Sequence, residues 1–138
     1  MHPMIRSALV LLAGVVVAVI VVTLMDGLAG RIFPLPAGVD TRDPESLRRA
    51  VAALPTTAFM LLLAGWVLAG AAGAYVAARL AAYAPVNHGM IVAGFVLLAT
   101  VANLAAIPHP SWMWPAVIIL IPAAGWAATK LVARPRVL

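Results

Sequence analysis

Residues 55–78 read PTTAFMLLLAGWVLAGAAGAYVAA, a run of 24 residues without a charged side chain. As a helix, this run is about 36 Å long, which is enough to cross the roughly 30 Å hydrocarbon core of a bilayer. Residues 7–25, 89–107 and 111–129 form three further uncharged runs of 19 residues each. The four runs together predict an all-α fold, an integral membrane four-helix bundle.

The composition agrees with a membrane protein. Of the 138 residues, 65% are hydrophobic and 9% are charged, whereas soluble chains carry about 25% charged residues. We expect a single transmembrane domain over the whole chain, because the spans use most of its length. The predicted spans are residues 5–25, 56–82, 88–107 and 111–132. The one substantial loop, residues 26–54, is too short for a soluble catalytic domain.

The loop of residues 26–54 holds all four acidic residues and a helix-start signal. Asp43 precedes Pro44 and Glu45, an order typical of a helix N-terminus, where Asp accepts hydrogen bonds from free amides and Pro fits the first turn. Hydrophobic residues then recur at helical spacing: Leu47, Val51 and Leu54. The loop therefore predicts a short amphipathic helix, and we favour a helix that caps the bundle over one lying on the membrane surface.

The basic residues near the span ends predict the orientation, because Lys and Arg are enriched on the cytoplasmic side. With the N-terminus inside, five basic residues lie on the cytoplasmic side: Arg6, Arg79, Lys130, Arg134 and Arg136. The other four lie in the first loop: Arg31, Arg42, Arg48 and Arg49. The difference is small, but the uncharged turn at residues 108–110 favours the same orientation. We therefore expect both termini in the cytoplasm and the amphipathic helix in the first extracytoplasmic loop.

Small residues repeat every four positions along the predicted second span, residues 56–82, in two adjacent rows. The candidate helix-packing residues are Gly65, Ala69, Gly70, Gly73, Ala74 and Ala77. Small side chains at this spacing let another helix backbone approach closely. The approaching helix belongs either to the same chain or to another one. The second alternative predicts a homo-oligomer or docking onto a larger membrane-protein complex.

Few polar residues lie at membrane depth, and most of them are near the predicted outer end. Polar groups within spans are functional-site candidates, so Asp26, Asn103 and His109 form a candidate outer polar site. The alternative, which we favour, is helix capping together with an interhelical hydrogen bond from Asn103. His2 and His88 would lie at the opposite end from His109, so the sequence predicts no metal site.

Several kinds of chemistry have no support in the sequence. The chain contains no cysteine, which excludes disulfides and thiolate catalysis. It shows no Gly-rich phosphate loop, no nucleophile motif and no paired carboxylates. We therefore predict no catalytic residues and no cofactor. The basic residues are scattered at span ends, where they contact lipid headgroups more often than nucleic acid, so we expect the lipid bilayer as a partner and no nucleic acid.

Several segments carry a resemblance to a known group of proteins. They are Met1–Arg6, Pro34–Pro36, Gly38–Asp40, Glu45–Leu47, Gly70–Ala78, Ile107–Trp112, Pro122 and Gly125–Trp126. In these segments the chain resembles an uncharacterised family of small four-span bacterial inner-membrane proteins. The resemblance covers nearly the whole chain and implies a bacterial inner (cytoplasmic) membrane location. It brings no catalytic residue to this chain.

Other four-span families differ from this chain at their defining residues. Small multidrug transporters need a glutamate in the first span, which here is rich in Val, Leu and Ala. Fluoride channels need a polar track and a broken third helix, and residues 89–107 show neither. The sequence therefore predicts a non-catalytic accessory or structural subunit that oligomerises or docks through the second span. The first alternative is a small oligomeric channel, carrier or lipid-handling protein, and the second is a membrane enzyme using Asp26 and His109.

Overall fold

The computed structural model describes residues 2–133, and the regular structure in this range is entirely helical. The helices are α1 (Pro3–Ile32), α2 (Pro44–Ala52), α3 (Thr56–Leu80), α4 (Pro85–Ala106) and α5 (Met113–Ala133). All except α2 are long and apolar enough to cross a membrane. The predicted all-α membrane four-helix bundle is confirmed, and the chain is a multi-pass membrane protein.

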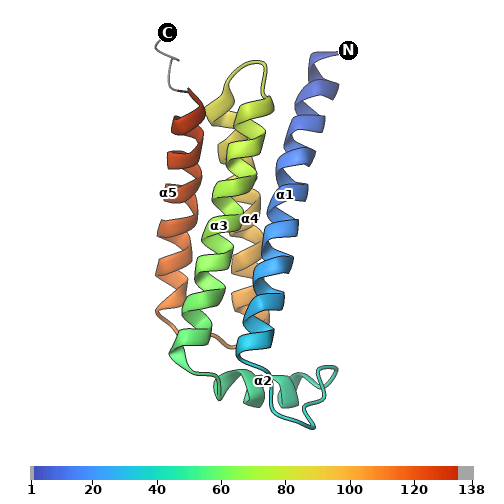
Figure 1. Cartoon of the computed structure of the whole chain (residues 1–138), viewed down its shortest axis with the longest axis vertical. Coiled ribbons are helices and arrows are strands. Elements are labelled where there is room, and N and C mark those ends of the chain that lie inside the picture. Colours follow the sequence, from blue (N-terminus) through green and yellow to red (C-terminus); the bar gives the residue numbers. More distant parts are fainter. Residues whose placement is uncertain (1, 134–138) are drawn as a thin grey trace.

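The four spanning helices run side by side, and successive ones point in opposite directions (Figure 1). Helix α3 is central: like α4 it contacts the other three spanning helices, and its contacts with α1 and α5 are the most extensive in the bundle. Helix α1 packs mainly on α3 and touches α4 over a shorter length, while α1 and α5 have no contact within residues 2–133. Helix α1 is therefore an edge helix, held to the bundle largely by one neighbour.

Helix α1 is longer than the predicted span, which ended at residue 25. It continues to Ile32, because Gly27 and Gly30 do not break it. A glycine in a helix interior costs about 1 kcal/mol relative to alanine, and the burial of Ala29 between them favours a continued helix. Asp26 therefore lies inside α1 and not after it. The other predicted spans agree with α3, α4 and α5 to within three residues.

Helix α2 lies across one end of the bundle (Figure 1). The predicted N-cap is confirmed, since the Asp43 carboxylate accepts hydrogen bonds from the amides of Glu45 and Ser46 at 3.2 and 3.1 Å. Val51 is buried in the main hydrophobic cluster, and Leu47 packs against it. Burial of this apolar face against the spanning helices confirms that α2 caps the bundle.

Candidate functional site

The first row of small residues on α3 faces α1. A Cβ atom added to Gly73 would lie 2.7 Å from the carbonyl oxygen of Gly14, and one added to Gly65 would lie 2.7 Å from the Cβ of Met25. Real Cβ atoms essentially never come so close. Ala69 and Ala77 on the same row are fully buried. Glycine at these positions is therefore what lets α1 approach α3.

The second row faces α4 and α5. A Cβ atom added to Gly70 would meet Ile121 of α5 at 3.0 Å. Ala74 is fully buried, and its carbonyl oxygen lies 2.7 Å from the position of a Cβ added to Gly89 of α4. The two rows thus serve two sets of neighbours in the same chain. The structure supports the intramolecular alternative, and these residues do not offer a free surface to a second chain.

The three residues of the candidate outer polar site do not form one cluster. Asp26 and Asn103 line the same cavity, whereas His109 does not. The His109 ring packs on Trp66 and edge-on against Phe59, with ring centroids 5.7 and 5.8 Å apart. Trp66 lines the cavity and so separates the histidine from it. Within residues 2–133, the pairing of Asp26 with His109 on which the membrane-enzyme alternative depends is therefore not formed.

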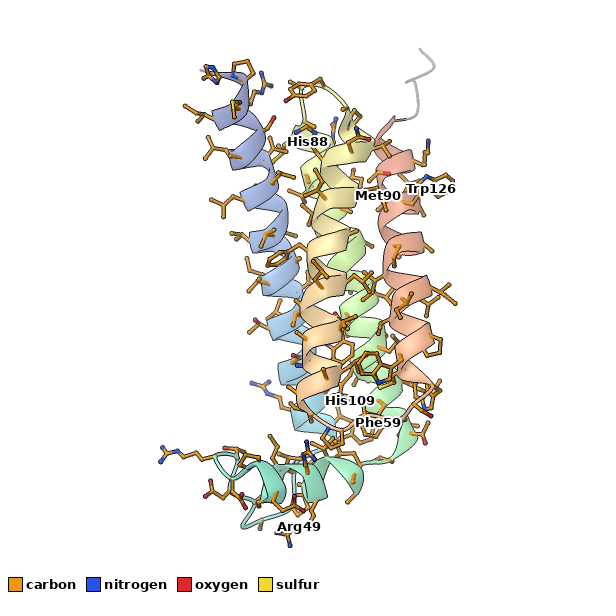
Figure 2. The ribbon with its side chains drawn as sticks, turned by 180° about the vertical axis from the view of Figure 1, so that it is seen from behind. Arg49, Phe59, His88, Met90, His109 and Trp126 are labelled. Atoms are coloured by element: carbon orange, nitrogen blue, oxygen red, sulfur yellow. The ribbon has the colours of Figure 1, made fainter. Side chains whose placement is uncertain are left out.

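His88 and His109 lie at opposite ends of the bundle, as the sequence predicts. Figure 2 shows His109 beside Phe59 near α2, and His88 at the far end. Each ring donates from Nδ1 to a backbone carbonyl, His109 to Ile107 at 2.7 Å and His88 to Ala84 at 3.1 Å. No group of three or more His, Cys, Asp or Glu in residues 2–133 is arranged to hold a metal ion.

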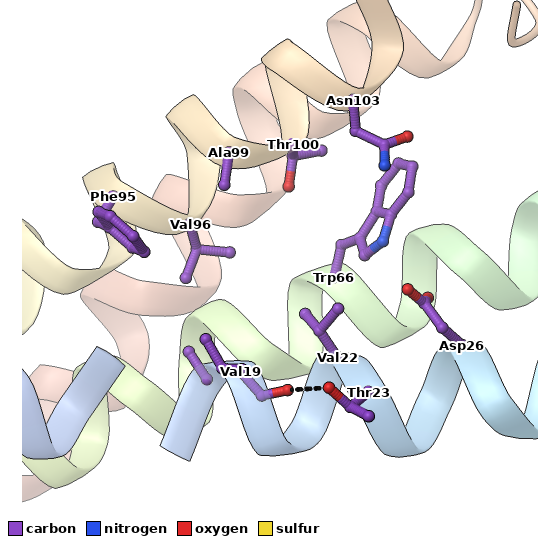
Figure 3. Close-up of a pocket in the computed structure, with 11 residues that line it drawn as sticks. Val19, Val22, Thr23, Asp26, Trp66, Phe95, Val96, Ala99, Thr100 and Asn103 are labelled. Carbon is purple, nitrogen blue, oxygen red and sulfur yellow. Dashed lines mark hydrogen bonds between the residues drawn. The ribbon is translucent and has the colours of Figure 1, made fainter. Parts of the chain in front are cut away.

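A cavity of about 200 Å³ lies between α1, α3 and α4 (Figure 3). Its apolar lining comes from Ala18, Val19 and Val22 of α1, Trp66 of α3, and Phe95, Val96 and Ala99 of α4. Its polar lining comes from Thr23, Asp26, Thr100 and Asn103. Most of the lining residues on α1 and α4 are exposed, both the apolar ones, with Val19 at 54% and Phe95 at 49%, and the polar Thr23, Asp26 and Asn103. The cavity therefore opens between these two helices on the lateral surface of the bundle, which faces lipid in a membrane.

The polarity of the cavity changes along the helix axes. Asp26 and Asn103 lie at its α2 end, and Val19 and Phe95 lie seven and eight residues away, about 11 Å deeper. Helix α4 has 22 residues and spans about 33 Å, close to the hydrocarbon thickness. Asn103, within one turn of its end, therefore lies near the edge of the hydrocarbon. The cavity is polar at the bilayer surface and apolar towards the bilayer centre.

The polar groups of the cavity differ in whether they have a hydrogen-bond partner. The Thr23 hydroxyl donates to the carbonyl of Val19 at 2.8 Å. Within residues 2–133, the Asp26 carboxylate has neither a hydrogen bond nor an ion pair, and the Asn103 side chain forms no interhelical bond of the kind we expected. Figure 3 shows the Asn103 amide directed at the Trp66 indole, with the Asp26 carboxylate on the facing helix. A carboxylate and an amide, both without a hydrogen-bond partner in the described range, thus lie beside an aromatic ring (Figure 3).

The candidate site named from the sequence contains two of the four polar cavity residues, Asp26 and Asn103, and neither of the aromatic ones. Thr23 precedes Asp26 by three residues, and Thr100 precedes Asn103 by three, so each pair shares one helix face. That repeated spacing was a usable signal. Trp66 lies within a span, away from the interfacial positions where tryptophan is common, which was a second signal. Neither of these two signals predicts that α1 lies close to α4.

The fold and cavity define a small multi-pass membrane protein with a lipid-facing binding site candidate. Comparison with protein-family models, with curated proteins and with solved structures finds no match.

Proposed function

We propose that this chain is a small non-catalytic lipid-handling protein that binds an amphiphilic molecule in the cavity between α1, α3 and α4. The observation that carries this proposal is the polarity gradient of a cavity that opens towards lipid. An amphiphile in a bilayer has the same gradient, with its head at the surface and its chain towards the centre. Such a molecule can enter sideways without leaving the membrane.

The size of the cavity suits the upper part of an amphiphile. An engineered apolar cavity of about 150 Å³ binds benzene, and this one measures about 200 Å³. It therefore has room for a head and the first carbons of a chain. The remaining chain would pass between Val19 and Phe95 into the bilayer. No group of the cavity is a paired nucleophile and base, so binding is the proposed activity and catalysis is not.

Tryptophan fluorescence tests the proposal. A variant with Trp112, Trp114 and Trp126 replaced by Phe leaves Trp66, which is 5% exposed, as the only tryptophan. In bilayers that contain single-chain amphiphiles with brominated chains, we expect quenching of Trp66, because such a chain occupies the cavity beside it. Ala99→Phe should fill the mouth and reduce the quenching. Ala102→Phe on the same helix, exposed and outside the cavity, is the control. Unquenched Trp66, or equal quenching in both variants, would sink the proposal.

An accessory subunit of a larger membrane complex is the second candidate. It is favoured by the exposure of α1. Only 17% of the apolar 18-residue stretch of α1 is buried, whereas 39% of the corresponding stretch of α3 is buried. This edge helix, and not the buried face of α3, would then meet the partner. Native mass measurement in mild detergent tests the idea, and a clean monomer under all mild conditions would refute it.

The proposed location is the bacterial inner membrane, with both termini in the cytoplasm and α2 outside. The distribution of Lys and Arg supports this orientation. We also propose that the chain belongs to the family of small four-span bacterial proteins whose loops it resembles. Cysteine accessibility at positions in α2, measured in intact cells, checks the orientation.

A further inference from the structure

We propose that the amphiphile bound in the α1–α3–α4 cavity carries a cationic ammonium head, which Asp26 neutralises beside the face of Trp66. This inference rests on the proposed lipid-handling function and names the class of ligand for that site. The ligand is defined by an ammonium group on an apolar chain.

The charge of the cavity is the first argument. Asp26 is the one charged residue among those that line it, and no basic side chain does. Within residues 2–133 the carboxylate has no ion-pair partner, and the one salt bridge there joins Arg49 to Glu45 on α2. The Asp26 side chain is exposed, so its carboxylate is open to a cation that enters the cavity. A cationic head would form the ion pair that the described part of the chain does not itself supply.

The aromatic and amide groups around Asp26 are the second argument. Cations bind favourably over the face of Trp, the strongest such ring among the amino acids. Trp66 lines the cavity beside Asp26 and Asn103 (Figure 3). The Asn103 amide is drawn with its nitrogen towards the indole in Figure 3; a 180° rotation of the amide would bring its oxygen there, where it can accept a hydrogen bond from an ammonium N–H. Carboxylate, indole face and amide oxygen are all suited to a cation.

The lack of basic residues in the lining also distinguishes between two kinds of ligand that carry an ammonium group. Phosphatidylethanolamine has an ammonium group and an anionic phosphate, whereas a single-chain lipophilic amine has the ammonium group alone. The described lining offers no Lys or Arg to the phosphate. The chemistry of the cavity therefore favours the single-chain amine, and the two sources can be distinguished by experiment.

The test uses nitroxide-bearing amphiphiles that have the same long chain and an ammonium, an uncharged or a sulfate head. The full-length Trp66-only variant is placed in phosphatidylcholine bilayers, and quenching is compared at equal membrane concentration of each probe. A Trp112-only variant reports ordinary lipid contact, since Trp112 is 38% exposed and outside the cavity. We expect Trp66 to prefer the ammonium probe over the uncharged one by about fivefold, the upper range for a partly exposed ion pair. Trp112 should show no preference.

Asp26→Asn assigns the preference to the carboxylate. We expect this variant to lose the fivefold preference and to keep the binding of the uncharged probe, which also shows that it is folded. Glu45→Gln makes the same change of charge on α2, outside the cavity, and should keep the preference. An unchanged preference in Asp26→Asn, or equal quenching by all three probes, overturns the ammonium assignment and leaves the lipid-handling function standing.

Two further outcomes complete the test. If no probe quenches Trp66 more than Trp112, the lipid-handling function itself fails, and the ammonium assignment fails with it. If phosphatidylethanolamine, replacing part of the phosphatidylcholine, displaces the cationic probe, the ammonium site is confirmed and its source is a membrane lipid. If it does not, an observed ammonium preference belongs to single-chain amines.

Discussion

The packing of α1 on α3 depends on Gly73, and replacing this residue should lower the stability of the folded chain without changing the number of chains that assemble. Gly73 and Gly14 face each other at the crossing of the two helices, and each would place an added Cβ within 2.8 Å of the other's carbonyl oxygen. A backbone oxygen cannot rotate away as a side chain can. Gly73→Ala therefore forces the two helices apart.

The magnitude follows from this geometry. A Cβ at Gly73 would lie 2.7 Å from the Gly14 oxygen, whereas ordinary contact begins at 3.4 Å, so the helices must separate by about 0.7 Å. Overpacking of this kind costs about 1–3 kcal/mol. Alanine also gains about 1 kcal/mol in helix propensity over glycine. The control Gly94→Ala on α4 has the same gain, and nothing lies within 4 Å of its added Cβ.

The propensity gain cancels when the two variants are compared. Gly73→Ala should therefore be less stable than Gly94→Ala by about 1–3 kcal/mol in free energy of unfolding. Reversible unfolding in mixed micelles, followed by circular dichroism, measures this difference. The larger Gly73→Leu should lower stability further, while native mass shows the same stoichiometry as the unsubstituted protein. Equal stability of the two alanine variants, or a changed stoichiometry in a stable Gly73→Leu, would refute the intramolecular packing of this face.

Two further outcomes test contacts at the two ends of the bundle. Tyr83→Phe removes the 2.7 Å hydrogen bond between Ser7 Oγ and Tyr83 Oη and should lower the free energy of unfolding by about 0.5–1.5 kcal/mol. Tyr75 has no such bond within residues 2–133, so Tyr75→Phe should leave the free energy of unfolding unchanged. Equal effects of the two substitutions would show that the Ser7–Tyr83 bond does not stabilise the fold. Asp43→Ala removes the α2 N-cap at a cost of about 1 kcal/mol and should speed hydrogen exchange of the first α2 amides. Thr41→Ala should leave these exchange rates unchanged. Identical exchange rates in the two variants would show that the cap does not stabilise α2.

The membrane helices could be predicted from the sequence because the requirement is local. A chain in lipid must satisfy its own backbone hydrogen bonds, so each long uncharged run forms a helix whatever its neighbours are. The start of α2 was predictable for the same reason, since Asp43, Pro44 and Glu45 act on adjacent amides. The end of α1 was not predictable from the sequence, because Gly27 and Gly30 favour an end of the helix locally, whereas the burial of Ala29 favours its continuation to Ile32.

The candidate site was only partly predictable, because it depends on three helices that are distant in the sequence. Asp26 and Asn103 could be selected as polar residues near span ends, but their separation from His109 depends on where the Trp66 ring lies. Nothing in the local sequence says whether a polar side chain faces a ring, a cavity or lipid. That choice is made by the rotation of each helix about its own axis.

The sequence by itself determined that this chain crosses a membrane four times, with a capped amphipathic helix after the first span, because length, charge and capping act within a single segment. Only the tertiary structure decided that the small residues of α3 are used within the chain, since their neighbours are Gly14, Met25 and Ile121 on other helices. It also decided that α1 and α4 leave a cavity between them. Packing among helices in lipid is set by the shapes of all of them together, and no single segment carries that information.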